Sequence, residues 1–309
     1  MEKNGVEVVT ITQEEVGERL DTVLAERFRE GYSRAYFQNL IDREGVLLNG
    51  QLVKKGSKLR VGDVVEVRFS IVREVRLVPE AIPLEIVYED QYLLVVNKPA
   101  GMVVHPAPGS WSGTFVHALL HHCQQLAIDP SDGWRPGIVH RLDKETSGLL
   151  VAAKTSSVQR KLVSLFASRQ VYKEYWAVCV GKLMEGEINA PIGRHPIRRK
   201  EMAVTLSGRQ ALSVCTSMGW NGQLSLVRVV IATGRTHQIR VHLKYKGTPV
   251  LGDSVYGDFS ANRRYGVHRQ LLHAAVMKFR HPVTQESLEF KASAPLDMRS
   301  FISSLSGRR

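Results

Sequence analysis

The sequence is poor in cysteine and contains no long apolar run. Its three cysteines, Cys123, Cys179 and Cys215, form no CxxC pair, which excludes a zinc ribbon and a disulfide framework and indicates a reducing compartment. No stretch approaches the roughly 18 apolar residues that span a bilayer, and the opening segment MEKNGVEVVTITQEE lacks the apolar core of a signal peptide. We therefore expect a soluble, cytoplasmic protein that has no membrane partner.

Signatures of cofactor-dependent chemistry are also missing. The sequence has no glycine-rich phosphate loop, so no nucleotide cofactor is expected, and Ser147-Gly148 is not part of a GxSxG nucleophile elbow. His117 and His121 have the helical spacing of metal ligands, but no acidic or Cys/His cluster elsewhere completes a site. We expect neither a metal nor any other cofactor.

Acidic residues are outnumbered by basic ones. Lys and Arg total 42 against 30 Asp and Glu, which gives a net charge of +12 over 309 residues. Such an excess attracts polyanions such as RNA, although the same charge would also serve solubility alone. The chain is 43% hydrophobic and 23% charged, as in ordinary globular proteins, and is long enough for one sizeable core plus a smaller module.

The segment before residue 70 predicts two short helices. In GERLDTVLAERF, four apolar residues recur at helical spacing: Leu20, Val23, Leu24 and Phe28. Ser33 is the expected N-cap of a second helix, and Gly45 lies where its C-terminal cap is expected. One face of that helix carries Phe37, Leu40 and Ile41.

Two turn signals follow these helices. Asn49-Gly50 lies between the apolar arms of VLLNGQLV, which is a strong signal for a β-hairpin. Gly62-Asp63 predicts a second turn before the strand VVEVRF. Two helices and a small sheet in so short a segment are typical of a binding module.

The pieces RLDTVLAERF, SRAYFQNLI, VLLNGQLVKKGSKL and GDVVEV together resemble the alpha-L RNA-binding motif, a small domain of ribosomal proteins and RNA-modifying enzymes. In that family the two helices and the adjoining loop face RNA. The resemblance implies that six residues lie near phosphates: Arg19, Ser33, Arg34, Gln38, Lys54 and Lys55. Solvated surface charge is the alternative interpretation for each of them.

The chain is expected to contain an RNA-binding domain over residues 1–69, a linker over 70–83 and a larger domain over 84–309. Residues 68–83 alternate charged and aliphatic side chains and contain Pro79 and Pro83, which suits a linker or an extended arm. Six later segments predict strands with few helices between them: LEIVYED, YLLVVNKPAG, GLLVAAKT, VYKEYWAVCVG, LSLVRVVIATG and SLEFKAS. This order predicts an α+β fold with a mixed, mainly antiparallel sheet.

Four pieces of the larger domain resemble the RluA/RluD family of ribosomal RNA pseudouridine synthases. They are VNKPAGMVVHP, HRLDKETSGLLVAAKT, YKEYWAVCVG and GRTHQIRVHLKYKGTPVLGD, with LLHAAVMKF as a weaker fifth match. The resemblance runs from about Leu84 to the C-terminal region. It implies the pseudouridine synthase fold, with helices flanking the sheet and a central cleft, and a cofactor-free isomerisation of uridine to pseudouridine in RNA.

Asp143 lies between Arg141 and Lys144, just before the apolar run GLLVAA. Breaking a glycosidic bond develops positive charge at the anomeric carbon, which a nearby carboxylate stabilises or attacks. Glycosidases use two carboxylates, but one is enough here because the uracil anion leaves without prior protonation and rejoins through a ring carbon. Asp143 is therefore the predicted catalytic residue, either as a nucleophile or as the base that removes a sugar proton.

A buried carboxylate stays ionised more readily beside a cation. The segment ATGRTHQIRVHLKYKG predicts a turn and a short helix, with Thr236 as N-cap and Gly247 as the C′ residue. In the family, the second arginine of this motif pairs with the catalytic aspartate, which assigns that role to Arg240. Arg235, the first arginine, is its rival and is expected to touch RNA.

Tyr175 is the third predicted catalytic residue. Strand alternation in VYKEYWAVCVG puts it on one face with Val171, Lys173 and Ala177. The family carries a tyrosine at this place. Its ring would stack on a flipped uracil, which is worth about 1–3 kcal/mol, and its hydroxyl could accept the proton from the ring carbon. A plain core residue is the alternative.

The target base must leave the RNA stack before it can react. Family members use the arginine at the position of Arg141 to fill the vacated stack or to hold the displaced phosphate. Lys98, His105 and the basic run over residues 194–200 are weaker candidates for backbone contacts, with a plain surface charge as the alternative for each.

The resemblance favours large-subunit ribosomal RNA as the substrate, with tRNA as the alternative, and a monomer is the default expectation. A second hypothesis is a ribosome-assembly protein that binds RNA and whose catalysis is secondary. Hydrolysis of the glycosidic bond would need a second carboxylate placed to activate water, which the sequence does not offer.

Overall fold

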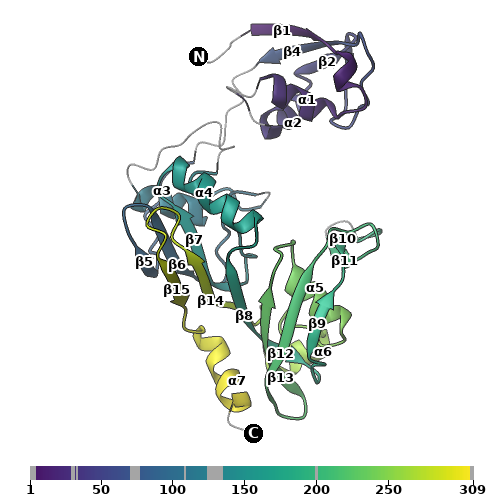
Figure 1. The fold of residues 1–309 in the computed structure, drawn as a ribbon. Coiled ribbons are helices and arrows are strands. Elements are labelled where there is room, and N and C mark those ends of the chain that lie inside the picture. Colours follow the sequence, from purple (N-terminus) through teal and green to yellow (C-terminus); the bar gives the residue numbers. More distant parts are fainter. Residues whose placement is uncertain are drawn as a thin grey trace. The chain divides into compact units, whose positions relative to one another are not determined.

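A computed structural model describes residues 5–28, 32, 34–69, 77–107, 109–123, 135–198 and 201–306. These residues form two compact units, one built from the chain up to Val78 and one containing most of the chain from Pro79 onward. Figure 1 shows both units and the labels of their elements. The predicted N-cap Ser33 and residues 70–76 of the predicted linker lie outside the described residues.

The first unit is a four-stranded sheet with two helices. Its strands are ordered β1-β4-β2-β3, and each neighbouring pair is antiparallel. The elements are β1 (Gly5–Thr10), the 3-10 helix η1 (Gln13–Glu15), α1 (Leu20–Arg27), α2 (Arg34–Asp42), β2 (Val46–Leu48), β3 (Gln51–Leu52) and β4 (Val64–Phe69).

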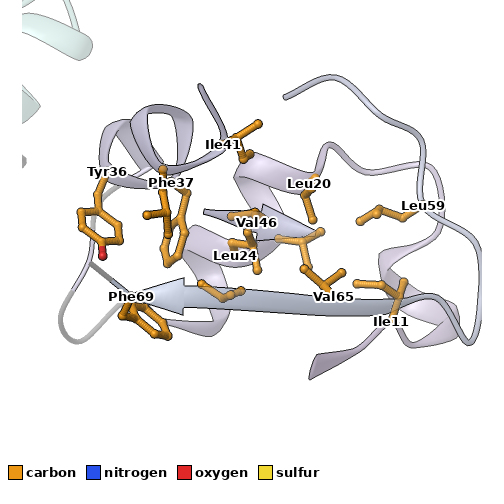
Figure 2. Packing of buried hydrophobic residues seen from close by; sticks show 13 residues of the cluster. Ile11, Leu20, Leu24, Tyr36, Phe37, Ile41, Val46, Leu59, Val65 and Phe69 are labelled. Carbon is orange, nitrogen blue, oxygen red and sulfur yellow. The ribbon is translucent and has the colours of Figure 1, made fainter. Parts of the chain in front are cut away.

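The core of the first unit lies between the helices and the sheet. Helix α1 buries Leu20 and Leu24, and α2 buries Phe37, all at 0% exposure, against Val46 and Val65 of the strands. Figure 2 shows these side chains together. The helical spacing read from GERLDTVLAERF is therefore the spacing that fills this core.

The hairpin prediction is confirmed and the capping prediction is wrong. Asn49 and Gly50 both have positive φ (52° and 74°), as a two-residue hairpin turn between β2 and β3 requires. The left-handed residue after α2 is Glu44 (φ 61°), not Gly45. Gly45 instead lies against Leu40, where an added Cβ would come within 2.6 Å of Cδ1. Arg68, placed at the start of the linker from sequence, belongs to β4.

The second unit contains a nine-stranded sheet, a two-stranded hairpin and five helices among its described residues. Its elements are β5 (Ile86–Glu89), β6 (Leu93–Lys98), α3 (Phe115–His122), β7 (Ser147–Ala153), α4 (Ser156–Ala167), β8 (Tyr172–Val180), β9 (Gly186–Asn189), β10 (Ile192–Arg194), β11 (Met202–Val204), β12 (Leu212–Trp220), β13 (Leu224–Ile231), α5 (Gln238–Tyr245), α6 (Phe259–Tyr265), β14 (Leu272–Arg280), β15 (Ser287–Lys291) and α7 (Leu296–Ser306).

The large sheet is mixed and mainly antiparallel, as the strand pattern predicts. Its order is β5-β6-β7-β14-β8-β13-β12-β9, with β15 paired to β14. Among the described strands, the one parallel pairing is that of β7 with β14. Strand β14 therefore lies between β7 and β8, which are consecutive strands of the chain, and it joins the two halves of the sheet.

Helices cover the sheet from both faces. Helix α4 packs Val158 and Leu162 against β6, β7 and β14, on the face where Val171, the residue just before β8, is also buried. Helix α7 packs Met298 against Val178 of β8, a residue of opposite parity on that strand. None of the helices that the structure describes combines the length and the apolar character of a membrane-spanning helix.

Gly148 makes the closest approach at the joint between β7 and β14. Its φ is 110°, and a Cβ there would lie 2.3 Å from the carbonyl oxygen of Ala274. We expect Gly148→Ala to lower the free energy of unfolding by about 3 kcal/mol or more, because both the φ strain and the backbone clash must be relieved. Gly186 has a similar φ (123°) but open space around it. Gly186→Ala should therefore lower the free energy of unfolding only by the cost of the backbone strain, about 1–2 kcal/mol. Denaturant unfolding measures both variants, and equal losses of stability would contradict the clash at Gly148.

Candidate active site

The loop that carries Asp143 is anchored at the foot of β7. Its residue Thr146 donates a backbone hydrogen bond to the Asp143 carbonyl at 3.1 Å, which closes a tight turn. The carbonyl of Lys144 accepts from the Gly101 amide at 2.9 Å. On the other side, the Val151 amide donates to Nε2 of His140 at 3.0 Å. The backbone of β6, its following turn and β7 thus fix the position of the carboxylate.

Arg240 binds two carboxylates at once. From α5, its Nη1 donates to Oδ2 of Asp143 at 2.9 Å. Its Nε and Nη2 donate to Oδ2 and Oδ1 of Asp253 at 2.6 and 3.0 Å. The arginine is 5% exposed. Burial disfavours its charge, but the two carboxylates outweigh that effect and hold the pKa of Arg240 above its usual range.

Asp253 anchors this arginine through its Nε and Nη2 atoms. It is fully buried and also accepts hydrogen bonds from the amides of Val255 and Tyr256, at 2.8 and 2.9 Å. Burial raises its pKa, but the hydrogen bonds and charge of Arg240 prevail and leave the pKa of Asp253 below its usual range. Sequence reasoning did not single out this residue, although it ends the quoted stretch GTPVLGD.

The two oxygens of Asp143 have different surroundings. Oδ2 is held by Arg240, whereas no described residue donates a hydrogen bond to Oδ1, and the nearest cation candidate, Nε2 of His237, is 4.0 Å away. The side chain is 19% exposed. One oxygen is therefore fixed by the protein, and the other is left available on the open side.

Helix α5 begins differently from the prediction. Its N-cap is His237, in the left-handed region (φ 56°), and not Thr236. Nδ1 of His237 lies 2.8 Å from the Tyr256 hydroxyl, which accepts from the Met202 amide at 2.8 Å. These contacts turn the imidazole toward Asp143, and burial lowers the pKa of His237 against the opposing effect of that carboxylate. The predicted C′ residue Gly247 has a φ of 74° and follows the C-cap Lys246.

Asp143, Arg240 and Tyr175 line one pocket. The loop before β7 contributes Arg141, Leu142, Asp143 and Thr146 to its wall; β8, β13 and β14 contribute Tyr175, Ile231 and Leu272; and the segment entering α5 contributes Gly234, Arg235, Thr236, His237, Gln238, Ile239 and Arg240. The structure thus brings together the three residues predicted to be catalytic, from three separate parts of the sequence. It adds His237, which the sequence analysis did not consider.

Tyr175 is held in the pocket wall as a neutral phenol. It is 7% exposed and lies on the face of β8 that the alternation predicts, with Lys173 and Ala177 also buried. Burial, followed by the charge of Asp143, raises the pKa of Tyr175 well above its usual value. A neutral phenol is a weak proton acceptor, so these surroundings favour the stacking role over the proton-accepting one.

Lys98 does not occupy the surface position predicted for it. The side chain is 1% exposed, and its ammonium group donates to the carbonyls of Pro99, Met102 and Lys144 at 2.7, 2.9 and 3.2 Å. Burial lowers the pKa of Lys98 to about 7, opposed by the charges of Glu145 and Asp143. The predicted RNA contact is wrong, because this ammonium is enclosed and ties the β6 turn to the Asp143 loop.

The two other predicted RNA-binding residues of this unit lie at the pocket. Arg141 is exposed on the pocket wall beside Asp143. Arg235 is half-buried, and its Nε donates to the Gln210 carbonyl at 3.0 Å. Both arginines therefore line the pocket that contains Asp143.

In the first unit, three predicted RNA-binding residues share one buried acid. Asp21 is fully buried and accepts from Arg19 at 2.9 Å, from Arg34 at 3.0 Å and from Gln38 at 2.5 Å. Burial alone would raise its pKa, but these hydrogen bonds outweigh burial and lower the pKa of Asp21 far below its usual value. The side chains of both arginines stay about half-exposed, at 51% and 49%. Sequence reasoning did not identify Asp21 as the residue that orients them.

The remaining predicted residues of this unit lie in the β3–β4 connection. Lys54 is exposed, and the ammonium group of the half-buried Lys55 forms an ion pair with Asp42 at the end of α2. Among the described residues of the whole chain, no three His, Cys, Asp or Glu side chains gather in a way that could hold a metal ion. His117 and His121 belong to the ordinary helix α3, where Nδ1 of His117 lies 2.8 Å from the Thr114 hydroxyl.

Two family models match the chain. The model described as RNA pseudouridylate synthase matches residues 92–245, which include the whole Asp143 loop, β8 and α5. The model described as S4 domain matches residues 18–65.

Curated proteins match over almost the whole length. A protein of Vibrio vulnificus named ribosomal large subunit pseudouridine synthase D is 40% identical over 302 residues, which cover 94% of this chain and 91% of the relative. A Bacillus subtilis protein named uncharacterized RNA pseudouridine synthase YlyB is 41% identical over 299 residues, covering 96% and 97%. The chain therefore belongs to the RNA pseudouridylate synthase family.

A solved structure supports the fold assignment. Human RNA pseudouridylate synthase domain containing 4 has a TM-score of 0.57 and 25% sequence identity, and the match covers 71% of this chain and 92% of the human one. The protein is thus an RNA pseudouridine synthase, an isomerase of the RluA type, with an S4 domain that binds RNA. Both the family and the fold predicted from the quoted motifs are confirmed.

The anchoring role of Asp253 can be tested with Asp253→Asn. We expect kcat to fall about 100-fold with little change in KM, because Arg240 loses a charged partner and no longer fixes Asp143 for the reaction. Asp258→Asn is the matched control, since Asp258 only caps α6 through the amides of Ser260 and Ala261. Steady-state kinetics on protein that is folded at the assay temperature would refute the anchor if both variants kept the same kcat.

The Asp21 network can be tested by stability. Asp21→Asn should lower the free energy of unfolding of the first unit by about 2 kcal/mol, because hydrogen bonds to a charged acceptor are lost in a buried place. Since the native pKa of Asp21 is lowered, its contribution is complete above the usual aspartate value of about 3.9 and is lost as the pH falls below it. Asp42→Asn removes only a surface pair and should cost under about 0.5 kcal/mol. Hydrogen exchange of α1 and α2 at pH 7 measures both, and equal effects would argue against the network.

Proposed function

We propose that Asp143 is the catalytic carboxylate, that Arg240 positions it, and that the pocket around them receives one uridine flipped out of RNA. The observation that carries this proposal is that the two oxygens of Asp143 have different hydrogen-bonding surroundings. Oδ2 accepts from Arg240 at 2.9 Å, while Oδ1 receives no hydrogen bond from the described residues, and Asp143 lines the pocket. A fixed, ionised carboxylate with one free oxygen is what the chemistry of the glycosidic bond needs.

The reaction begins when the bond between the anomeric carbon and N1 of uracil breaks and its electron pair remains on the base. Oδ1 of Asp143 supports this step either by bonding to the anomeric carbon or by removing a sugar proton, and both routes require the ionised form. The uracil anion turns in the pocket and its C5 bonds to the anomeric carbon. As that bond forms, the bond from Oδ1 to the carbon breaks, or, on the other route, the removed sugar proton returns. C5 then loses its proton to solvent and N1 gains one, so the product is an isomer of the substrate. The Asp143–Arg240 pair keeps the charge in place throughout.

Tyr175 and Arg141 serve base extraction. The phenol ring of Tyr175 in the pocket wall supplies a stacking surface for uracil, which is worth about 1–3 kcal/mol. The exposed guanidinium of Arg141 replaces the base in the RNA stack or holds its phosphate. Together these two contacts offset part of the few kcal/mol that flipping a nucleotide costs.

The substrate that we propose is large-subunit ribosomal RNA. Support comes from the net charge of +12, from the S4 domain and from the names of curated relatives about 40% identical to this chain. Within the S4 domain, Arg19, Arg34 and Gln38 are oriented by Asp21 and, with Lys54 and Lys55, contact backbone phosphates. We assign residues 1–69 to RNA binding, 70–83 to a linker and 84–309 to catalysis, and place the protein in the cytoplasm, where its three free thiols stay reduced.

Asp143→Asn should reduce isomerisation by more than about 10³-fold while RNA affinity changes little, because the amide keeps the shape but not the charge. Tritium release from uridine labelled at C5, in an unmodified transcript of large-subunit ribosomal RNA, measures the rate. Glu145→Gln removes a negative charge two residues away and should leave the rate unchanged. An Asn variant that still releases tritium would refute the catalytic role.

The unaltered protein and its Asp143→Asn variant also test the substrate in cells. A strain that lacks the gene should lose specific pseudouridines from its large-subunit ribosomal RNA and none from its tRNA. The unaltered gene should restore them, whereas the Asp143→Asn gene should not. Loss confined to tRNA would refute the proposed substrate without affecting the assignment of the site.

A further inference from the structure

Lys173 is a buried lysine beside the active site that the catalytic scheme does not use. Alternation along β8 places it on the same face as Tyr175, two residues away, and Tyr175 lines the pocket. The residue is only 7% exposed. A lysine so deeply placed normally has a charged or polar partner.

The surroundings of Lys173 connect it to the rim of the pocket. Its ammonium nitrogen lies 5.8 Å from the centre of the Phe166 ring. His140 stacks on that ring with the two ring centres 4.5 Å apart, and the next residue in the chain is Arg141 of the pocket wall. The charge of Lys173 also acts on His140: burial, followed by that charge, lowers the pKa of His140 to about 3.

No group in the described part of the chain balances the charge of Lys173. Among the described residues, no carboxylate forms an ion pair with Lys173, and no acceptor forms a hydrogen bond with its ammonium group, so the interaction with Phe166 is its one polar contact. Burial lowers the pKa of Lys173 to about 8, and no nearby acid counteracts it. The two other buried cations of this region differ, because Lys98 donates to three carbonyls and Arg240 to two carboxylates.

The end of the side chain remains accessible. Among the described side chains, the one fully enclosed polar atom without a hydrogen bond is Nε2 of His281. The ammonium nitrogen of Lys173 also has no hydrogen bond from the described residues, so, unlike that imidazole nitrogen, it is not fully enclosed. A largely buried cation that keeps some exposure and has no counter-ion among the described residues is suited to an anion from outside.

We propose that Lys173 binds a backbone phosphate of the RNA adjacent to the flipped uridine. This proposal rests on the assignment of the Asp143 pocket as the place of that uridine. A nucleotide inserted into the pocket brings its flanking phosphates near Arg141 of the pocket wall and near Lys173, which is two residues from the pocket residue Tyr175. The partly desolvated surroundings of the ammonium strengthen its attraction to a phosphate relative to an exposed lysine.

The test replaces Lys173 by Met, which retains the apolar stem and removes the charge. RNA affinity is measured in the Asp143→Asn background, with an unmodified large-subunit ribosomal RNA transcript, between 50 and 200 mM salt. We expect affinity at the lowest salt to fall about tenfold, as for the loss of one charge-assisted hydrogen bond. The slope of log affinity against log salt should become shallower by about 0.7, the value for one phosphate contact on a single strand.

Lys161→Met is the matched control, because Lys161 is exposed on α4 and the same charge is removed; it should leave the slope unchanged. Lys173→Arg should restore most of the slope, and Lys173→Gln serves as the neutral variant if the Met variant does not fold. An unchanged slope in the neutral variant would overturn the proposal, and so would a lowered melting temperature with unaltered affinity, which marks a structural lysine. Failure of the catalytic assignment shows separately, as tritium release by Asp143→Asn with Lys173 intact.

Discussion

The guanidinium of Arg240 is the group on which the active site depends. It is almost completely buried and carries one positive charge between two negative ones, so none of the three groups can be removed without leaving the others poorly compensated. Asp253 takes the Nε edge and holds the arginine still, which leaves Nη1 for Asp143. In the mechanism that we propose, a carboxylate oriented in this way would need no reorganisation as charge develops on the sugar, and such preorganisation is usually the largest source of electrostatic catalysis.

The RNA-binding unit uses the inverse arrangement, in which one buried acid orients several donors. Asp21 holds Arg19 and Arg34 by one edge of each guanidinium, while about half of each side chain remains exposed. If the exposed part contacts RNA, as we propose, it has less conformational entropy left to lose than a free arginine would have. Positioning through a buried counter-charge is thus common to the two units of the chain.

Local patterns predicted much of this structure, and long-range contacts account for what they missed. The Asn49-Gly50 hairpin, the buried face of α1 and the alternation of β8 follow from neighbouring residues, and the structure confirms them. The motif order indicated the fold, and it placed Asp143, Tyr175 and Arg240 in one pocket. Sequence could not show that Lys98 is enclosed by three carbonyls, or that Asp253 completes the arginine site, because such contacts depend on how distant segments pack. The N-cap of α5 is His237 and not Thr236, and its imidazole contacts Tyr256, a partner 19 residues away that local sequence could not indicate.

The position of β14 sets an order of events during translation. Strands β7 and β8 follow each other in the chain but do not pair, because β14 lies between them in the sheet. Strand β14 begins more than 90 residues after β8 ends. A nascent chain on the ribosome cannot close the sheet, or bring Arg240 to Asp143 from 97 residues away, until late in synthesis. The small first unit relies on nearby contacts and can fold as soon as it emerges. The growing polypeptide would therefore be able to bind RNA well before its active site is assembled.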